Sequence, residues 1–127
     1  MEPATINLTD EEQMARYVAI WQRRMAAQQA QSIRLAEQVR SEASQIAAML
    51  RSRFGVTRVI LFGSLRRGSF AYGSDIDLAV AGLARQDFFA AVAEANALAH
   101  TWVDIKPLED LKPHFRQRVL ETGEDLA

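Results

Sequence analysis

The sequence predicts a small α/β fold, of the α+β type, in which helices pack on one face of a mixed sheet behind an N-terminal helical extension. Two observations predict this fold. Residues 9–54 contain neither glycine nor proline, which is typical of a long helical region. After Gly55, apolar runs at 57–62, 75–81 and 101–106 alternate with helical patterns at 85–99 and 113–121. Elements in this order favour a sheet covered by helices.

The helical region has a recognisable start and an apolar stripe. Thr9 and Glu12 have the spacing of a capping box, in which each side chain binds the backbone N–H of the other residue. Apolar residues then recur at intervals of three, four or seven, as one face of a helix requires. They are Met14, Val18, Trp21 and Met25, followed by Leu35, Val39, Ile46 and Leu50.

A polar patch at residues 28–32, with the sequence Gln-Gln-Ala-Gln-Ser, separates the two parts of this stripe. We expect a kink or loop here, and therefore two helices. The alternative is a single helix, which would be roughly 65 Å long at 1.5 Å per residue. Such a helix would have to extend from the domain and find a partner.

The second predicted strand opens with two aspartates. Because side chains alternate along a strand, Asp75 and Asp77 share one face about 7 Å apart, while Ile76 and Leu78 point to the core. Neighbouring carboxylates repel unless they are protonated, solvated or neutralised, and Mg²⁺ prefers carboxylate oxygens together with phosphates. The pair indicates a cation site, although aspartates at a strand start are also common as solvated turn formers.

The loop before this strand adds the features of a phosphate site. Gly63 follows the first strand and allows close backbone approach, Ser64 offers a hydroxyl and an amide, and a short helix after it would direct N–H groups at an anion. Arg66 and Arg67 add positive charge, although loop arginines are also often only solvated. The combination predicts a nucleotide site, which neither the Gly-Ser pair nor the Asp-x-Asp pair predicts alone.

These residues resemble a known family. Gly-Ser, ten residues, then Asp-x-Asp is similar to the signature of the DNA polymerase beta-like nucleotidyltransferases, and most of all to the minimal nucleotidyltransferase (MNT) group. Arg66 departs from the alanine usual in that group. The resemblance implies an MNT domain over residues 32–127, with residues 1–31 as a helical extension. The matching residues are Gly63, Ser64, Arg67, Gly68, Ser74, Asp75, Ile76, Asp77 and Leu78.

The family implies a third carboxylate on a later strand, and Asp104 in the run 101–106 is the candidate. Alternation places Asp104 on the face opposite to Val103 and Ile105. If this strand lies beside the one that begins at Asp75 with the apolar faces aligned, Asp104 joins Asp75 and Asp77 on one surface. The alternative is a surface aspartate on an edge strand.

The resemblance also implies a reaction, in which the enzyme transfers AMP from ATP with two Mg²⁺ ions held by Asp75, Asp77 and Asp104. Asp104 would in addition orient or deprotonate the acceptor hydroxyl. Gly63 and Ser64 would bind the β- and γ-phosphates, and Arg66, Arg67 and Ser74 would complete the nucleotide-binding set. MNT proteins commonly pair with HEPN-domain toxins, and some transfer AMP to a tyrosine of the toxin. We therefore expect an antitoxin that adenylylates a HEPN partner.

Composition limits the other classes. The 127 residues carry 15 basic and 16 acidic side chains, so no broad surface for nucleic acid is expected. Cysteine is absent, which excludes disulfides and zinc-thiolate sites, and no membrane span or signal peptide is recognised, so we expect a cytoplasmic protein. His100 and His114 do not form a metal pair.

Two other functions compete with the antitoxin hypothesis. The domain could bind a nucleotide or a partner without catalysis, although a cluster of three carboxylates argues against this. It could instead nucleotidylate a small molecule, but the chain has no room for a substrate domain. The acceptor site must then come from a partner, a second copy or the N-terminal helices, and the stripe from Met14 to Met25 predicts a surface for a homo-oligomer or for the HEPN partner.

Overall fold

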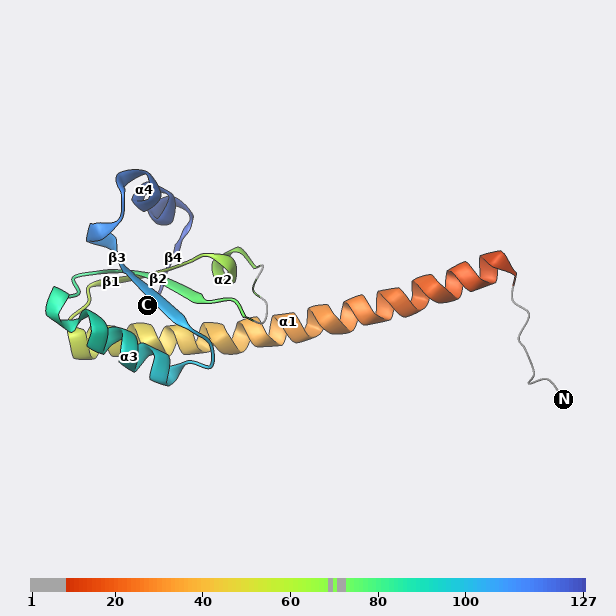
Figure 1. Cartoon of the computed structure of the whole chain (residues 1–127), viewed down its shortest axis with the longest axis horizontal. Coiled ribbons are helices and arrows are strands. Elements are labelled where there is room, and N and C mark those ends of the chain that lie inside the picture. Colours follow the sequence, from red (N-terminus) through yellow and green to blue (C-terminus); the bar gives the residue numbers. More distant parts are fainter. Residues whose placement is uncertain (1–8, 69, 71–72) are drawn as a thin grey trace. The chain divides into compact units, whose positions relative to one another are not determined.

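The computed structural model describes residues 9–68, 70 and 73–127. The chain divides between Ile33 and Arg34 into two units, of which the second holds the sheet. Within these residues the α-helices are α1 (Asp10–Phe54), α2 (Ser64–Arg67), α3 (Phe88–Leu98) and α4 (Pro113–Thr122), and the strands are β1 (Arg58–Phe62), β2 (Ile76–Ala81), β3 (Val103–Pro107) and β4 (Glu124–Asp125) (Figure 1). None of the described helices is both long enough and apolar enough to span a membrane.

The helical region is one helix, so the expectation of two helices was wrong. Its start is the predicted capping box, because the Thr9 amide donates to Glu12 Oε2 at 3.1 Å and the Glu12 amide donates to Thr9 Oγ1 at 3.2 Å. The polar patch does not break the helix, since glutamine and alanine are good helix formers and the Ser32 hydroxyl binds the carbonyl of Gln28. The helix ends before Gly55, whose φ of 68° suits glycine.

The strands form a mixed sheet, as the sequence predicted, and their order is β3-β2-β1-β4. β1 pairs antiparallel with β2 and β4, and β2 pairs parallel with β3. The three predicted strands agree with the structure to within two residues, and the short strand β4 was not predicted. β4 is held at the sheet edge by an ion pair between Arg58 and Asp125 at 2.7 Å and by a second pair between Arg40 and Glu124.

One face of the sheet carries the main core. The α1 residues 39–50 and the helix α3 pack there against apolar side chains of β1 and β2, in agreement with the predicted layer. The stripe residues Val39, Ile46 and Leu50 are fully buried in this core, as are the small α3 residues Ala91 and Ala95.

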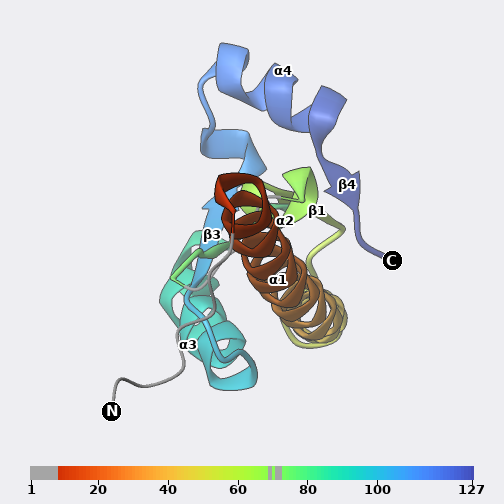
Figure 2. The ribbon, with the colours of Figure 1, turned by 90° about the vertical axis from the view of Figure 1, so that its right-hand side faces the viewer.

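The opposite face is partly covered by α4, whereas the sequence predicted helices on one face only. Val119 of α4 is buried against Ile60 of β1 and Ala79 of β2, with Phe62, Leu108 and Leu111 packed around them. Figure 2 shows α4 and α3 on opposite sides of the strands. The carboxylates predicted for the site therefore lie on a face that is walled on one side by a helix.

Candidate functional site

The site begins where β1 ends. Gly63 has φ 77° and ψ −154°, a backbone conformation that residues other than glycine rarely adopt. The chain turns at this residue and enters α2 directly. A Cβ atom at this position would lie 2.1 Å from Asp77 Oδ2. Glycine is thus required twice, once by the turn and once by the approach of the Asp77 carboxylate to the backbone.

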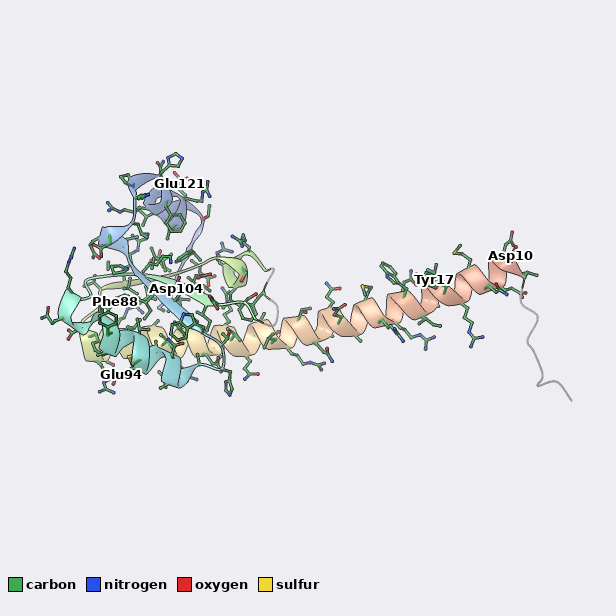
Figure 3. All side chains as sticks on the ribbon, viewed as in Figure 1. Asp10, Tyr17, Phe88, Glu94, Asp104 and Glu121 are labelled. Atoms are coloured by element: carbon green, nitrogen blue, oxygen red, sulfur yellow. The ribbon has the colours of Figure 1, made fainter. Side chains whose placement is uncertain are left out.

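Asp77 occupies the centre of the candidate site because β2 lies between β1 and β3. In the register of the sheet, Asp77 is opposite Phe62 on the antiparallel side and beside Asp104 on the parallel side. Neighbouring strands are separated by about 4.8 Å, so the two carboxylates are held close by backbone hydrogen bonds. Asp75 directly precedes β2 and is exposed, while Asp77 and Asp104 are half-buried (Figure 3 labels Asp104).

The environment of Asp77 disfavours its charged form. Burial raises the pKa of Asp77 above its usual value, and the negative charges of Asp104 and Asp75 raise this pKa further. Lys106 and Arg67 act in the opposite direction without cancelling the effect. A cation bound beside Asp77 would therefore stabilise the charged form of its carboxylate.

Asp104 already has a cationic neighbour. Lys106 lies two residues further along β3, on the same face, and its Nζ donates to Asp104 Oδ2 at 2.7 Å. Within the residues that the structure describes, no three His, Asp or Glu side chains are gathered as ready-made metal ligands. The donors nevertheless fit a hard divalent cation in their chemistry, because they are carboxylates whose mutual repulsion such an ion would relieve.

A cleft of about 790 Å³ opens beside Asp77. Five of the residues predicted from the sequence line it, namely Gly63, Ser64, Arg66, Arg67 and Asp77. Asp75, Asp104 and Ser74 are outside the lining. Ser74 immediately precedes Asp75, and its backbone carbonyl accepts a hydrogen bond from the Thr101 hydroxyl at 2.7 Å.

The other wall of the cleft comes from α4, which sequence reasoning did not connect with the site. Phe115, Arg118, Val119 and Thr122 line it. Their spacing of three and four residues places them on one face of the helix, and this periodicity was visible in the sequence. It could not reveal that this face turns towards the carboxylates, because that depends on Val119 packing across the sheet.

Residues outside the cleft have structural contacts. His100 pairs through Nδ1 with the buried Glu42, and among the described residues no metal-binding group includes either histidine. Glu109 accepts a hydrogen bond from the Gly82 amide at 2.8 Å.

Comparisons with known proteins agree with this arrangement. Residues 44–127 match the family described as polymerase beta, nucleotidyltransferase. A solved structure described as a minimal nucleotidyltransferase is 32% identical with a TM-score of 0.62, and the match covers 70% of this chain and 93% of that one. No curated protein sequence matches.

Two further solved structures are similar to about two thirds of the chain. One is a toxin–antitoxin with AMP-PNP, which is 27% identical with a TM-score of 0.56 over 68% of this chain and 72% of that one. The other is a mutant toxin–antitoxin that contains MntA, which is 25% identical with a TM-score of 0.56 over 65% of this chain and 69% of that one.

Proposed function

This chain belongs to the polymerase beta nucleotidyltransferase family, and from that premise we propose that it transfers AMP from ATP to a hydroxyl group of a partner protein. The observation that carries the proposal is the register of the sheet, which places Asp77 beside Asp104 and against the Gly63 turn. This arrangement supports a reaction at a phosphate held between the turn and the carboxylates.

The reaction has one bond-forming and one bond-breaking event. The acceptor oxygen attacks the α-phosphorus of ATP, the bond from that phosphorus to the bridging oxygen breaks, and pyrophosphate leaves. Asp104 accepts the hydroxyl proton, and Ser64 with Arg66 and Arg67 binds the triphosphate through donors and positive charge. Two Mg²⁺ ions held by Asp75, Asp77 and Asp104 would neutralise charge on the phosphates and stabilise the attacking and leaving oxygens. Ser74 completes the proposed nucleotide-binding set from the loop before Asp75.

The proposed acceptor is a tyrosine of a HEPN-domain toxin, so the protein acts in the cytoplasm as an antitoxin. Support comes from the similarity to toxin–antitoxin structures, one of them with AMP-PNP. The cleft is also open to solvent, and residues 34–127 contain no separate substrate-binding domain. Both features suit an acceptor that is supplied by a second protein. We propose that residues 32–127 form the catalytic domain.

The direct test uses ATP labelled at the α-phosphate. Purified protein is incubated with this ATP, Mg²⁺ and the product of the neighbouring gene, and the modified residue is located by mass spectrometry. We expect the α-label on a tyrosine and pyrophosphate in solution. Inhibition of the toxin without any transferred label would contradict catalysis and would favour inhibition by binding alone. Label on a small molecule would contradict the protein acceptor.

Replacement of Asp104 with asparagine tests its proposed role as proton acceptor. We expect the rate of transfer to fall by roughly 100-fold or more, since general base catalysis typically contributes 10²- to 10⁴-fold. The affinity for AMP-PNP should change much less. Lys106→Gln is the matched control, because it removes the partner of Asp104 and keeps the carboxylate. An unchanged rate in Asp104→Asn would show that another group accepts the proton.

We also propose that the protein self-associates through its N-terminal helical segment. Between residues 9 and 31 every residue is exposed, and Met14, Val18, Trp21 and Met25 repeat at intervals of four and three, as in a coiled-coil seam. Tyr17 beside this seam is 68% exposed (Figure 3). An apolar surface of this kind is typical of an interface.

The proposed occupant of this surface is a second copy of the same segment in antiparallel orientation. Acidic residues begin the helix at 10–12, whereas Arg23 and Arg24 lie near the other end of the seam, just before Met25. A parallel pair in register would place the two acidic starts side by side, whereas an antiparallel pair separates them and brings each one to residues 27–29 of the other helix, close to Arg24. The same orientation stacks Met14 on Met25 and Val18 on Trp21.

Substitution of Trp21 by glutamate should therefore convert a dimer into a monomer, as measured by light scattering of the full chain. A charge placed in the seam loses the apolar contact and is desolvated without a partner. Ala19→Glu, on the side of the helix away from the seam, is the control and should leave the mass unchanged. A wild-type protein that is monomeric alone and associates only with the toxin would overturn self-association in favour of the partner.

A further inference from the structure

Helix α4 presents one continuous row of side chains to the cleft. Phe115, Arg118 and Thr122 are spaced by three and four residues, and Val119 beside them is buried against β1 and β2. This anchor fixes the rotation of the helix, so the row faces the Gly63 turn and Asp77 across the cleft. The wall is therefore a fixed part of the site.

The charge of the cleft suits an anion larger than a single phosphate. Arg66, Arg67 and Arg118 line it together with the carboxylate of Asp77. Among the described residues none of the three guanidinium groups forms an ion pair with a carboxylate. Arg116 on the same helix differs, because it is bound to three backbone carbonyls at 3.0 Å and holds the start of α4 in place.

The aromatic part of the cleft suits a planar ring. Phe115 is 36% exposed and meets Phe62 in an edge-to-face contact, with ring centroids 5.8 Å apart and an interplanar angle of 79°. Apart from the charged groups, the polar side chains of the lining are the hydroxyls of Ser64 and Thr122. A nucleobase can stack on an aromatic wall of this kind, but few groups are present to read the edge of the base.

From this geometry we infer that α4 forms the base-binding wall of the nucleotide cleft. Phe115 stacks on the base, and Arg118 binds the phosphate chain together with Arg66 and Arg67. Recognition depends on ring stacking and on phosphate charge, so the site takes nucleoside triphosphates and does not distinguish adenine from guanine. The inference rests on the proposed nucleotide-binding function and assigns the residues that set its selectivity.

The test is calorimetric titration of the full chain with AMP-PNP, GMP-PNP and AMP in the presence of Mg²⁺. We expect the wild-type protein to bind the two triphosphate analogues within about threefold of each other. Phe115→Ala should weaken both by roughly 5- to 150-fold, the range observed when base stacking on an aromatic side chain is lost. Phe115→Trp keeps a stacking surface and should restore the affinity.

Arg118→Gln should weaken AMP-PNP by at least about 10-fold and weaken AMP less, because the contact is with the phosphate chain. Arg85→Gln is the matched control, since Arg85 follows the end of β2 that is distant from Asp77 and lines no part of this cleft. Melting curves of each variant establish that it is folded.

Two results would overturn the inference while leaving the proposed function intact. One is unchanged affinity in Phe115→Ala or in Arg118→Gln when the wild type binds AMP-PNP. The other is a preference of more than about 10-fold between AMP-PNP and GMP-PNP, which would require groups that read the base edge. A wild-type protein that binds none of these compounds would overturn both the inference and the proposed function.

Discussion

Replacement of Asp77 with asparagine should abolish nucleotidyl transfer and leave the fold intact. The substitution keeps the shape of the side chain and removes a charged oxygen at the centre of the site, between Phe62 and Asp104 in the register of the sheet. The expected fall in the transfer rate exceeds the roughly 10- to 100-fold loss seen when a residue only orients a metal ligand. The rate is measured with α-labelled ATP and the toxin as acceptor.

The same variant should be at least as stable as the wild type in the absence of Mg²⁺. The pKa of Asp77 is raised by burial and by Asp104 and Asp75, so at neutral pH the folded state carries a charge that it disfavours. Asparagine resembles the neutral form and removes this penalty. The gain in melting temperature should shrink as the pH is lowered to about 4, where aspartate in the unfolded chain also becomes neutral.

Addition of Mg²⁺ provides an independent readout on the same two proteins. An ion that binds only the folded state raises the melting temperature, and we expect this rise in the wild type and a smaller one in Asp77→Asn. Asp87→Asn, at the start of α3, is the control for loss of one acidic charge. An undiminished transfer rate in Asp77→Asn would contradict the assignment of Asp77 as a catalytic carboxylate.

Replacement of Gly63 with alanine should also abolish transfer, but through a different cause, and with a loss of stability. The added Cβ would lie 2.1 Å from Asp77 Oδ2, so either the turn or the carboxylate has to move. The combination of φ 77° and ψ −154° lies in a region that is almost restricted to glycine, and it adds strain of about 1–3 kcal/mol for a residue with a side chain. Both the melting temperature and the transfer rate are expected to fall.

Gly55→Ala separates the two causes. Gly55 has a similar φ of 68°, but no atom lies within 4 Å of a Cβ built there, so this variant carries the backbone strain without the collision. We expect it to lose stability through the strain of a positive φ while keeping the transfer rate. If Gly63→Ala remained as active as Gly55→Ala, the close approach of Asp77 to the turn would have no role in catalysis.

The sequence determined those features that follow from local periodicity and local hydrogen bonding. Thr9 and Glu12 form the predicted capping box because both partners lie within one turn of helix. The three predicted strands are present, and Asp77 and Asp104 meet in register on neighbouring strands as the alignment of apolar faces suggested. The period of two along a strand makes such a prediction robust.

Tertiary structure alone decided which elements meet at the site. α4 packs across the sheet through Val119, against Ile60 and Ala79, and thereby brings Phe115 and Arg118 to the cleft. The close approach of Asp77 to Gly63 likewise depends on how β2 packs against the turn that follows β1. The prediction of a break in the helical region was wrong although it used only local sequence. The polar patch at 28–32 interrupts the apolar stripe, but its residues are good helix formers, so the backbone hydrogen bonds of α1 continue through it. Side-chain pattern predicts the face on which a residue lies, but only the packing of distant segments determines what lies opposite that face.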